Sequence, residues 1–140
     1  MDKTVLDIRE YNKEGYKPLV DYGEWRVAIL NYIDELDLDQ NPRLERHMET
    51  DEVFVLLRGR TVLYMAGNEK QVKEITPQVM EPGKLYNVKR AAWHNILMSH
   101  DASVLLVENK NTSKKNTEYF RPTPEMQTQL REIARYNQIE

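Results

Sequence analysis

The sequence predicts an all-β fold of antiparallel strands that ends in a single α-helix. Short segments rich in β-branched, aliphatic and aromatic residues recur between residues 25 and 109, separated by turns that contain Gly, Pro and Asn. Strands at such short and even spacing are typical of an antiparallel sandwich or barrel. The periodicity becomes helical only after residue 123. The length of 140 residues fits one domain over 1–140, with a barrel core at about 17–109 and a helix at about 124–138.

The composition excludes several classes of protein and of site. The chain has no cysteine, which excludes disulfides, thiolate zinc sites and a thiol nucleophile, and fits a reducing compartment. Its 20 basic and 23 acidic residues give a net charge of −3, so we expect no nucleic-acid partner. The N-terminal segment has no long apolar stretch, and no run approaches the length of a membrane span. We therefore expect a cytoplasmic protein without a membrane partner.

The first part of the β region predicts three strands. WRVAILNYI (25–33) is rich in β-formers and follows Gly23, so it is predicted to be a strand. The acidic segment DELDLDQNPR (34–43) ends in Asn-Pro and is predicted to be a loop. EVFVLLRG (52–59) and RTVLYMAG (60–67) are the next two strands, and Gly59 closes the first of them.

The second part continues this pattern and then changes character. The predicted strands are QVKEITPQVM (71–80), KLYNV (84–88), HNILMS (94–99) and SVLLVEN (103–109), with a turn at EPG (81–83). The polar stretch 109–122 is predicted to be a solvated linker. Thr123 can cap a helix that begins at Pro124, and Met126, Leu130, Ile133 and Ala134 then share one face. We expect this helix to pack on the barrel or on a partner.

Four polar side chains stand at the heads of apolar strands. Glu45 and His47 are two residues apart, so they share a face if this piece is extended. Glu52 and His94 each begin a strand and share a face with its apolar residues. A buried acid is costly unless it is paired or bound to metal, and imidazole with carboxylate suits iron, manganese, zinc or nickel. The residue types also fit a charged turn with a surface histidine, so both interpretations stay open.

The spacing of these residues resembles the two motifs of the cupin superfamily. The first motif runs G-x(5)-H-x-H-x(3,4)-E-x(6)-G, and here His47 is followed by METD, Glu52, VFVLLR and Gly59. The second runs G-x(5)-P-x-G-x(2)-H-x(3)-N, and here Gly83 is followed by KLYNV, by KRA in the P-x-G position, by two residues and by His94. His47, Glu52 and Gly59 thus match positions of the first motif, and Gly83 and His94 match positions of the second.

The sequence also departs from the cupin pattern. Asp39 stands where the first motif opens with Gly, Lys89 and Ala91 replace Pro and Gly, and Met98 replaces Asn. Glu45 replaces the first His of the HxH pair. Three roles stay open for Glu45: a metal ligand, a catalytic base beside His47, Glu52 and His94 as the ligands, or neither.

The resemblance covers residues 44 to about 108 and implies a fold and a range of functions. It implies a cupin-type double-stranded β-helix, a jelly-roll barrel whose open end holds a divalent metal, namely iron, manganese, zinc or nickel. The leading interpretation is a metal-dependent isomerase, lyase or dioxygenase that acts on a small polar metabolite such as a sugar or an organic acid. The alternatives are a non-catalytic module that binds or senses a small ligand, and a structural dimer with a degenerate site. Small cupins usually pair, so we expect a homodimer.

Three aromatic residues are candidates for a substrate pocket. Tyr86 and Trp93 flank the second motif, and Tyr64 lies in a strand, so these side chains could line a pocket mouth. Aromatic residues in strands also pack in cores, which is the alternative for all three. Glu108 lies at a strand end and could point inward, with no further role assigned.

Overall fold

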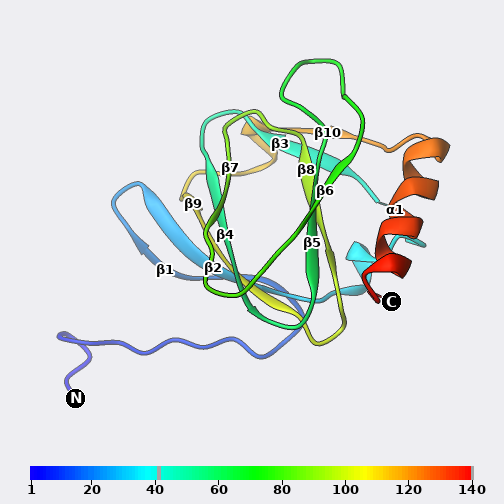
Figure 1. Cartoon of the computed structure of the whole chain (residues 1–140). Coiled ribbons are helices and arrows are strands. Elements are labelled where there is room, and N and C mark those ends of the chain that lie inside the picture. Colours follow the sequence, from blue (N-terminus) through cyan, green and yellow to red (C-terminus); the bar gives the residue numbers. More distant parts are fainter. Residues whose placement is uncertain (41, 140) are drawn as a thin grey trace.

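The computed structural model describes residues 1–40 and 42–139. Within these ranges the chain forms ten strands in two antiparallel sheets, followed by one α-helix (Figure 1). Asn41 of the predicted loop 34–43 and Glu140 at the end of the predicted domain lie outside the described residues. No helix in the described ranges is long and apolar enough to cross a membrane.

Each sheet contains five strands from distant parts of the described sequence. The first sheet has the order β1 (Gly15–Tyr22), β2 (Trp25–Asn31), β9 (Ser103–Asn109), β4 (Glu52–Arg58) and β7 (Tyr86–Val88). The second sheet has the order β10 (Thr117–Phe120), β3 (Leu44–His47), β8 (His94–Met98), β5 (Thr61–Met65) and β6 (Thr76–Val79). The remaining elements are the 3-10 turns η1 (Asp34–Leu36) and η2 (Lys114–Asn116) and the helix α1 (Pro124–Tyr136).

The prediction of a mostly β, antiparallel fold with a C-terminal helix is confirmed. The two sheets are not joined into one closed barrel by strand pairing between the described residues. The predicted solvated linker 109–122 is wrong in part, because Thr117–Phe120 forms β10 and pairs with β3. The capping box between Ser113 and Asn116 closes η2 just before this strand, and TEYF supplies β-forming residues after it.

Two cores divide the molecule into three layers. One core lies between the sheets and contains Phe54, Leu106 and Ile96. The other lies between the second sheet and α1, where Leu130 is fully buried. Strand residues alternate between faces, so β8 contributes to the first core through one set of side chains and to the second through the other. Figure 1 shows α1 beside β5 and β8, on the side away from β1 and β2.

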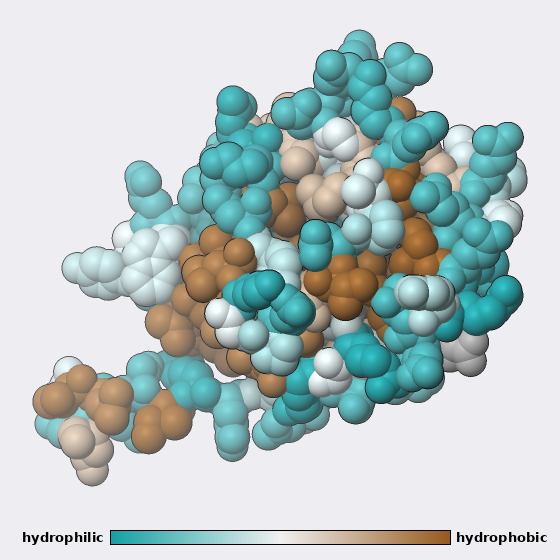
Figure 2. All heavy atoms as spheres, viewed as in Figure 1, coloured by the Kyte–Doolittle hydropathy of each residue, from teal (hydrophilic) through white to brown (hydrophobic). Residues whose placement is uncertain are grey.

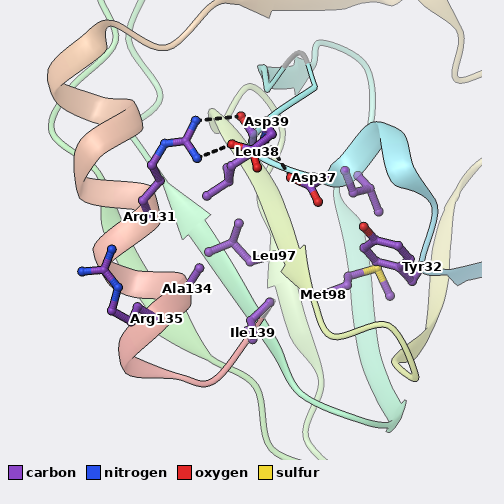
Figure 3. A pocket seen from close by; sticks show the side chains of 11 residues that line it. Tyr32, Asp37, Leu38, Asp39, Leu97, Met98, Arg131, Ala134, Arg135 and Ile139 are labelled. Atoms are coloured by element: carbon purple, nitrogen blue, oxygen red, sulfur yellow. Dashed lines mark hydrogen bonds and ion pairs between the residues drawn. The ribbon is translucent and has the colours of Figure 1, made fainter.

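The helix also holds the loop that contains η1. Arg131 forms an ion pair with Asp39 and donates to the carbonyl oxygen of Leu38 at 3.4 Å (Figure 3). A hollow of about 330 Å³ lies between the helix, this loop and the second sheet. Leu36 lines both this hollow and a larger cavity described below.

The outer face of the first sheet carries aliphatic side chains that belong to neither core. They form two lateral rows, Val27–Val107–Val53 and Ile29–Leu105–Val55. All six are half-buried, and neither core of the described residues includes them. Residues 1–10 form an arm that extends from the body beside β1 (Figure 1). Its apolar side chains are exposed, with Val5 at 76% and Ile8 at 85%. Figure 2 shows apolar residues gathered on the arm and on the part of the body next to it.

Candidate functional site

Two imidazoles and a carboxylate meet between the sheets. Glu45 and His47 point inward from β3, His94 points inward from β8, and Glu52 does so from β4 across the interior. Oε1 of Glu52 lies 3.1 Å from Nε2 of His47 and 3.1 Å from Nε2 of His94. Glu45 is the sheet partner of His94, and its Oε1 lies 3.9 Å from Nε2 of His47. The structure therefore brings all four predicted polar residues together.

Neighbouring groups orient both imidazoles. Nδ1 of His94 lies 2.9 Å from the carbonyl oxygen of Ala92, an acceptor, so this nitrogen is the donor. The neutral ring of His94 then carries its lone pair on Nε2, which faces Glu52. Nδ1 of His47 lies 2.9 Å from Oγ1 of Thr117, the residue that pairs with it on β10. The strand β10, which was predicted to be a linker, thus supports the ring of His47.

The spacing of these atoms fits a divalent metal. A metal about 2.1 Å from each ligand atom places two ligands at right angles about 3.0 Å apart. The separations of 3.1 Å between Glu52 and the two imidazoles match that spacing. The ligand atoms of Glu45, His47 and His94 lie within 4.8 Å of one another, as do those of His47, Glu52 and Glu108.

In the metal-free protein, hydrogen bonds join Glu52 to both imidazoles, and these bonds shift the pKa values of all three groups. Burial disfavours charge on Glu52, but its hydrogen bonds with His47 and His94 lower the pKa of this carboxyl to about 2. Burial disfavours the protonated imidazoles too, yet hydrogen bonding to Glu52 and its negative charge raise the pKa of both His47 and His94. A protonated imidazole and a divalent metal therefore compete for the same carboxylate.

We expect metal-free protein to lose stability as the pH rises above about 6.5, the ordinary histidine pKa. A pKa that is raised on folding contributes stability below the unfolded value and loses it as the pH passes the folded value. This applies to His47 and His94. The lowered pKa of Glu52 instead contributes folding stability above about pH 4.5, so this contribution does not change between pH 6 and 8. Denaturant titrations in EDTA at pH 6, 7 and 8 measure this. With Zn²⁺ the trend should reverse, because metal binding needs neutral imidazoles. A metal-free stability that rises with pH over this range contradicts the prediction.

A second buried charged cluster, which the sequence did not reveal, adjoins the first. Oε1 of Glu108 accepts hydrogen bonds from the Tyr16 hydroxyl at 2.7 Å and from Arg26 Nη2 at 3.0 Å. Burial, then the negative charges of Glu108 and Glu52, raises the pKa of Tyr16 well above its usual range. Alternation along β9 could have indicated Glu108, because it shares a face with Leu106, but no local pattern points to Tyr16 or Arg26.

Both clusters line one cavity of about 630 Å³ that opens between the sheets, the η1 loop and the segment before β10. Tyr64 borders this cavity, although it also belongs to the core under α1, and burial followed by the charge of Glu45 raises its pKa. Tyr86 and Trp93 do not line it, contrary to expectation. Trp93 points to the opposite face of its sheet and packs in the core under α1, whereas the Tyr86 hydroxyl accepts from the backbone N–H of Glu81.

No family model matches the sequence, and no curated protein does so. Solved structures match the fold. A cupin-2 domain protein from Shewanella frigidimarina is 14% identical, with a TM-score of 0.51, covering 71% of this chain and 85% of that chain. The chain has the cupin fold. Streptomyces Pac13 in a complex with uridine is 14% identical, with a TM-score of 0.51, covering 82% of this chain and 85% of that chain. WlaRA from Campylobacter jejuni, a TDP-fucose-3,4-ketoisomerase, is 13% identical, with a TM-score of 0.51. The match covers 66% of this chain and 65% of that chain.

A turn at residues 89–92 brings the second motif to the first. Oδ1 of Asp51 accepts from the backbone N–H of Arg90 at 2.7 Å, so this acid closes the turn and takes no part in the site. The N–H of Ala91 donates to the carbonyl oxygen of His47 at 2.8 Å. Ala91 has a φ of 67°, in the left-handed region that favours glycine. The cupin pattern has glycine at this position, so the departure there changes the residue and keeps the turn.

Replacing Ala91 with glycine should stabilise the protein by about 0.5–1 kcal/mol. The substitution removes the steric penalty that a Cβ pays in the left-handed region. Glycine also raises the conformational entropy of the unfolded chain, which offsets only part of this gain. The measurement is the midpoint of urea unfolding for Ala91→Gly against wild type. Ala92→Gly is a suitable control, because Ala92 has no positive φ. A loss of stability in Ala91→Gly that equals the loss in Ala92→Gly contradicts this account of the turn.

Proposed function

We propose that this chain is a divalent-metal-dependent enzyme that acts on a small polar molecule. One observation carries the proposal: Nε2 atoms of His47 and His94 converge on one oxygen of Glu52 at the base of a cavity. The volume of about 630 Å³ lies within the range of about 300–1,000 Å³ usual for small-molecule sites. The donor set suits iron, manganese, zinc or nickel. When bound, such an ion polarises a carbonyl or hydroxyl oxygen of the substrate.

The chain's own residues would divide the remaining work. His47, His94 and Glu52 would hold the ion, with Thr117 and the carbonyl of Ala92 fixing the rings. We assign Glu45 the role of base that removes a proton from the bound substrate. Its side chain is 24% exposed and lines the cavity, and it lacks the short contacts that engage Glu52.

Isomerisation and elimination are the reaction classes that such a base supports best. Each begins when a proton leaves a carbon next to a polarised group. Solved structures with this fold include Pac13, described as a nucleoside dehydratase, and a TDP-fucose-3,4-ketoisomerase. These similarities support a sugar-like metabolite for this chain, although at about 14% identity they establish only the fold.

The test of this proposal measures metal first and proton transfer second. Protein stripped with EDTA is loaded with Zn²⁺, Mn²⁺, Ni²⁺ or Fe²⁺, and its metal content is determined. Loaded protein is then incubated in D₂O with a panel of sugars, and exchange of carbon-bound protons is followed by NMR. We expect about one ion per chain, and a fall in exchange of about 10²–10⁴-fold in Glu45→Gln with metal retained. Wild type that takes up none of these ions rules the proposal out.

We further propose that the chain is one cytoplasmic domain and works as a homodimer. Both strand faces in β4 and β9 are apolar, a pattern typical of sheets covered on both sides. The arm, with Val5, Leu6 and Ile8 exposed, can cover the outer face of the first sheet in a second copy. Ten extended residues span about 33 Å, against about 19 Å for the width of five strands. About ten arm residues and a similar number on the face approach the 20–30 per side of a stable interface.

Sedimentation tests the homodimer. Wild type should sediment at twice the mass of one chain at micromolar concentration. Leu105→Glu should give monomers, because it places a charge in the middle of the apolar face, and removal of residues 1–10 should weaken the dimer. Val79→Glu is the matched control, since Val79 is 48% exposed on β6 of the second sheet. A wild type that sediments as a monomer contradicts the proposal.

A further inference from the structure

Glu108 is a buried carboxylate in an otherwise apolar row. It is 6% exposed and shares a face of β9 with Leu106 and Val104 of the inner core. On one side it pairs with Arg26 of β2. On the other side, β4 and β9 are paired through Val53 and Val107, which brings Glu52 next to it. A buried carboxylate beside another carboxylate is unfavourable, which makes Glu108 a candidate for a use beyond packing.

The two oxygens of Glu108 have different surroundings. All three hydrogen bonds to the Glu108 carboxylate end on Oε1, one from the Tyr16 hydroxyl at 2.7 Å and two from Arg26 at 3.0 and 3.3 Å. Oε2 accepts none from residues 1–40 and 42–139, and it is not among the fully enclosed polar atoms without a partner. Since Glu108 lines the cavity, Oε2 is the oxygen left free for a molecule bound there. Tyr16 and Arg26 thus orient the carboxylate and leave one acceptor unused.

We propose that Oε2 of Glu108 accepts a hydrogen bond from a hydroxyl group of the substrate, and that this substrate is a neutral polyhydroxylated molecule. This inference rests on the proposed function and decides between the two substrate classes that the sequence left open. A carboxylate accepts hydrogen bonds and cannot donate them, so it selects O–H groups and repels an acid. Glu45 adds a second acceptor of the same kind to the cavity.

The charge of the site supports a neutral ligand. Three charged residues that line the cavity, Glu35, Arg43 and Lys114, are exposed, so water screens them. Among the charged lining residues that are not exposed, Arg26 and a divalent ion would carry three positive charges, and Glu45, Glu52 and Glu108 carry three negative charges when ionised. The buried and half-buried part of the site would therefore be neutral without a charged substrate. An anionic ligand would add a net negative charge to a cavity with buried walls, where charges are poorly screened.

Arg26 also argues against Glu108 as a metal ligand. A ligand atom of Glu108 lies within 4.8 Å of those of His47 and Glu52, and the guanidinium and the Tyr16 hydroxyl leave only Oε2 unoccupied. The ion pair with Arg26 compensates the negative charge that would attract an ion to this oxygen. Glu108 would then contact the substrate, with Tyr16 and Arg26 as positioning residues. Metal affinity and substrate preference thus depend on different carboxylates.

The test compares neutral sugars with matched acids. Metal-loaded and metal-free wild type are titrated with monosaccharides and with their uronic acids, for example D-glucose and D-glucuronate, and binding is measured by ligand-observed NMR. The same titrations use Glu108→Gln, which keeps the shape and removes the charge. Glu118→Gln is the matched control, because Glu118 is paired with Arg46 at 2.6 Å and does not line the cavity.

We expect wild type to favour the neutral members by at least 10-fold, and Glu108→Gln to reduce this preference at least 10-fold without loss of metal. A purely structural Glu108 would change stability and leave the preference as it is. The inference is overturned if the acids bind more tightly to wild type, if no neutral member binds, or if Glu108→Gln keeps the preference. It is also overturned if Glu108→Gln loses its metal. Failure of wild type to bind metal instead contradicts the proposed function, while the metal-free titrations still report the preference.

Discussion

His94→Ala should lower the affinity for Zn²⁺ by at least about 100-fold. Changes to groups that merely orient a ligand cost about 10–100-fold, and this substitution removes a ligand itself. The effect should be large because His94 is 1% exposed and no other imidazole among the described residues can take its place in the site. The factor corresponds to about 2.7 kcal/mol of binding free energy. Competition titration with a chromogenic chelator measures it.

His100→Ala is the matched control for this experiment. His100 is exposed in the turn between β8 and β9, and the centroid of its ring lies 4.3 Å from that of the Tyr32 ring. Its removal should leave Zn²⁺ affinity unchanged. Unfolding in EDTA establishes that His94→Ala is folded before the titration. Equal affinities of folded His94→Ala and wild type are incompatible with the site described here.

Gly59→Ala should destabilise the protein by about 2–4 kcal/mol and lower its melting temperature by roughly 10 °C. Gly59 has a φ of 77°, which is unfavourable for residues with a Cβ. A Cβ there would also lie 2.5 Å from Cα of Ala102 and 2.8 Å from its backbone nitrogen, so backbone has to move. Gly59 follows the strand that carries Glu52, and we expect the melting temperature with Zn²⁺ to fall as well.

Gly23→Ala separates the two causes. Gly23 has a φ of 58°, but a Cβ there would meet nothing within 4 Å. Its substitution should therefore cost only the left-handed penalty, about 1 kcal/mol. Urea unfolding of both variants gives the comparison. Equal losses in the two would show that the approach of Ala102 contributes nothing.

The sequence predicted those parts of the site that depend on local alternation. In β4 and β8 a polar residue begins each strand and shares its parity with core residues, so the inward direction of Glu52 and His94 followed from period two. The separations His47–Glu52–Gly59 and Gly83–His94 added the resemblance to cupins, and the solved structures agree with that fold. Element type and side-chain direction were thus available from residues close in sequence.

What the sequence could not predict depends on contacts between distant segments. Tyr16 and Arg26 reach Glu108 across 92 and 82 residues, and nothing near them in the chain marks them as partners. Thr117 supports His47 from a stretch whose lysines and asparagines are typical of a linker. For Trp93 the sequence left a pocket and a core open, because aromatic side chains suit both, and the sheet decides which face they occupy.

The position of Trp93 equips the protein with an internal optical reporter. The chain has two tryptophans, and they differ in exposure: Trp93 is 4% exposed, whereas Trp25 on the first sheet is 43% exposed. Trp93 precedes His94, donates to the carbonyl oxygen of Glu69 at 2.8 Å and has the guanidinium of Arg46 4.7 Å from its ring centre. Aqueous quenchers reach Trp25 preferentially, so the emission that remains comes from a ring shielded beneath α1. That emission reports on the strand that presents His94, which makes occupancy of the site readable by fluorescence without a label.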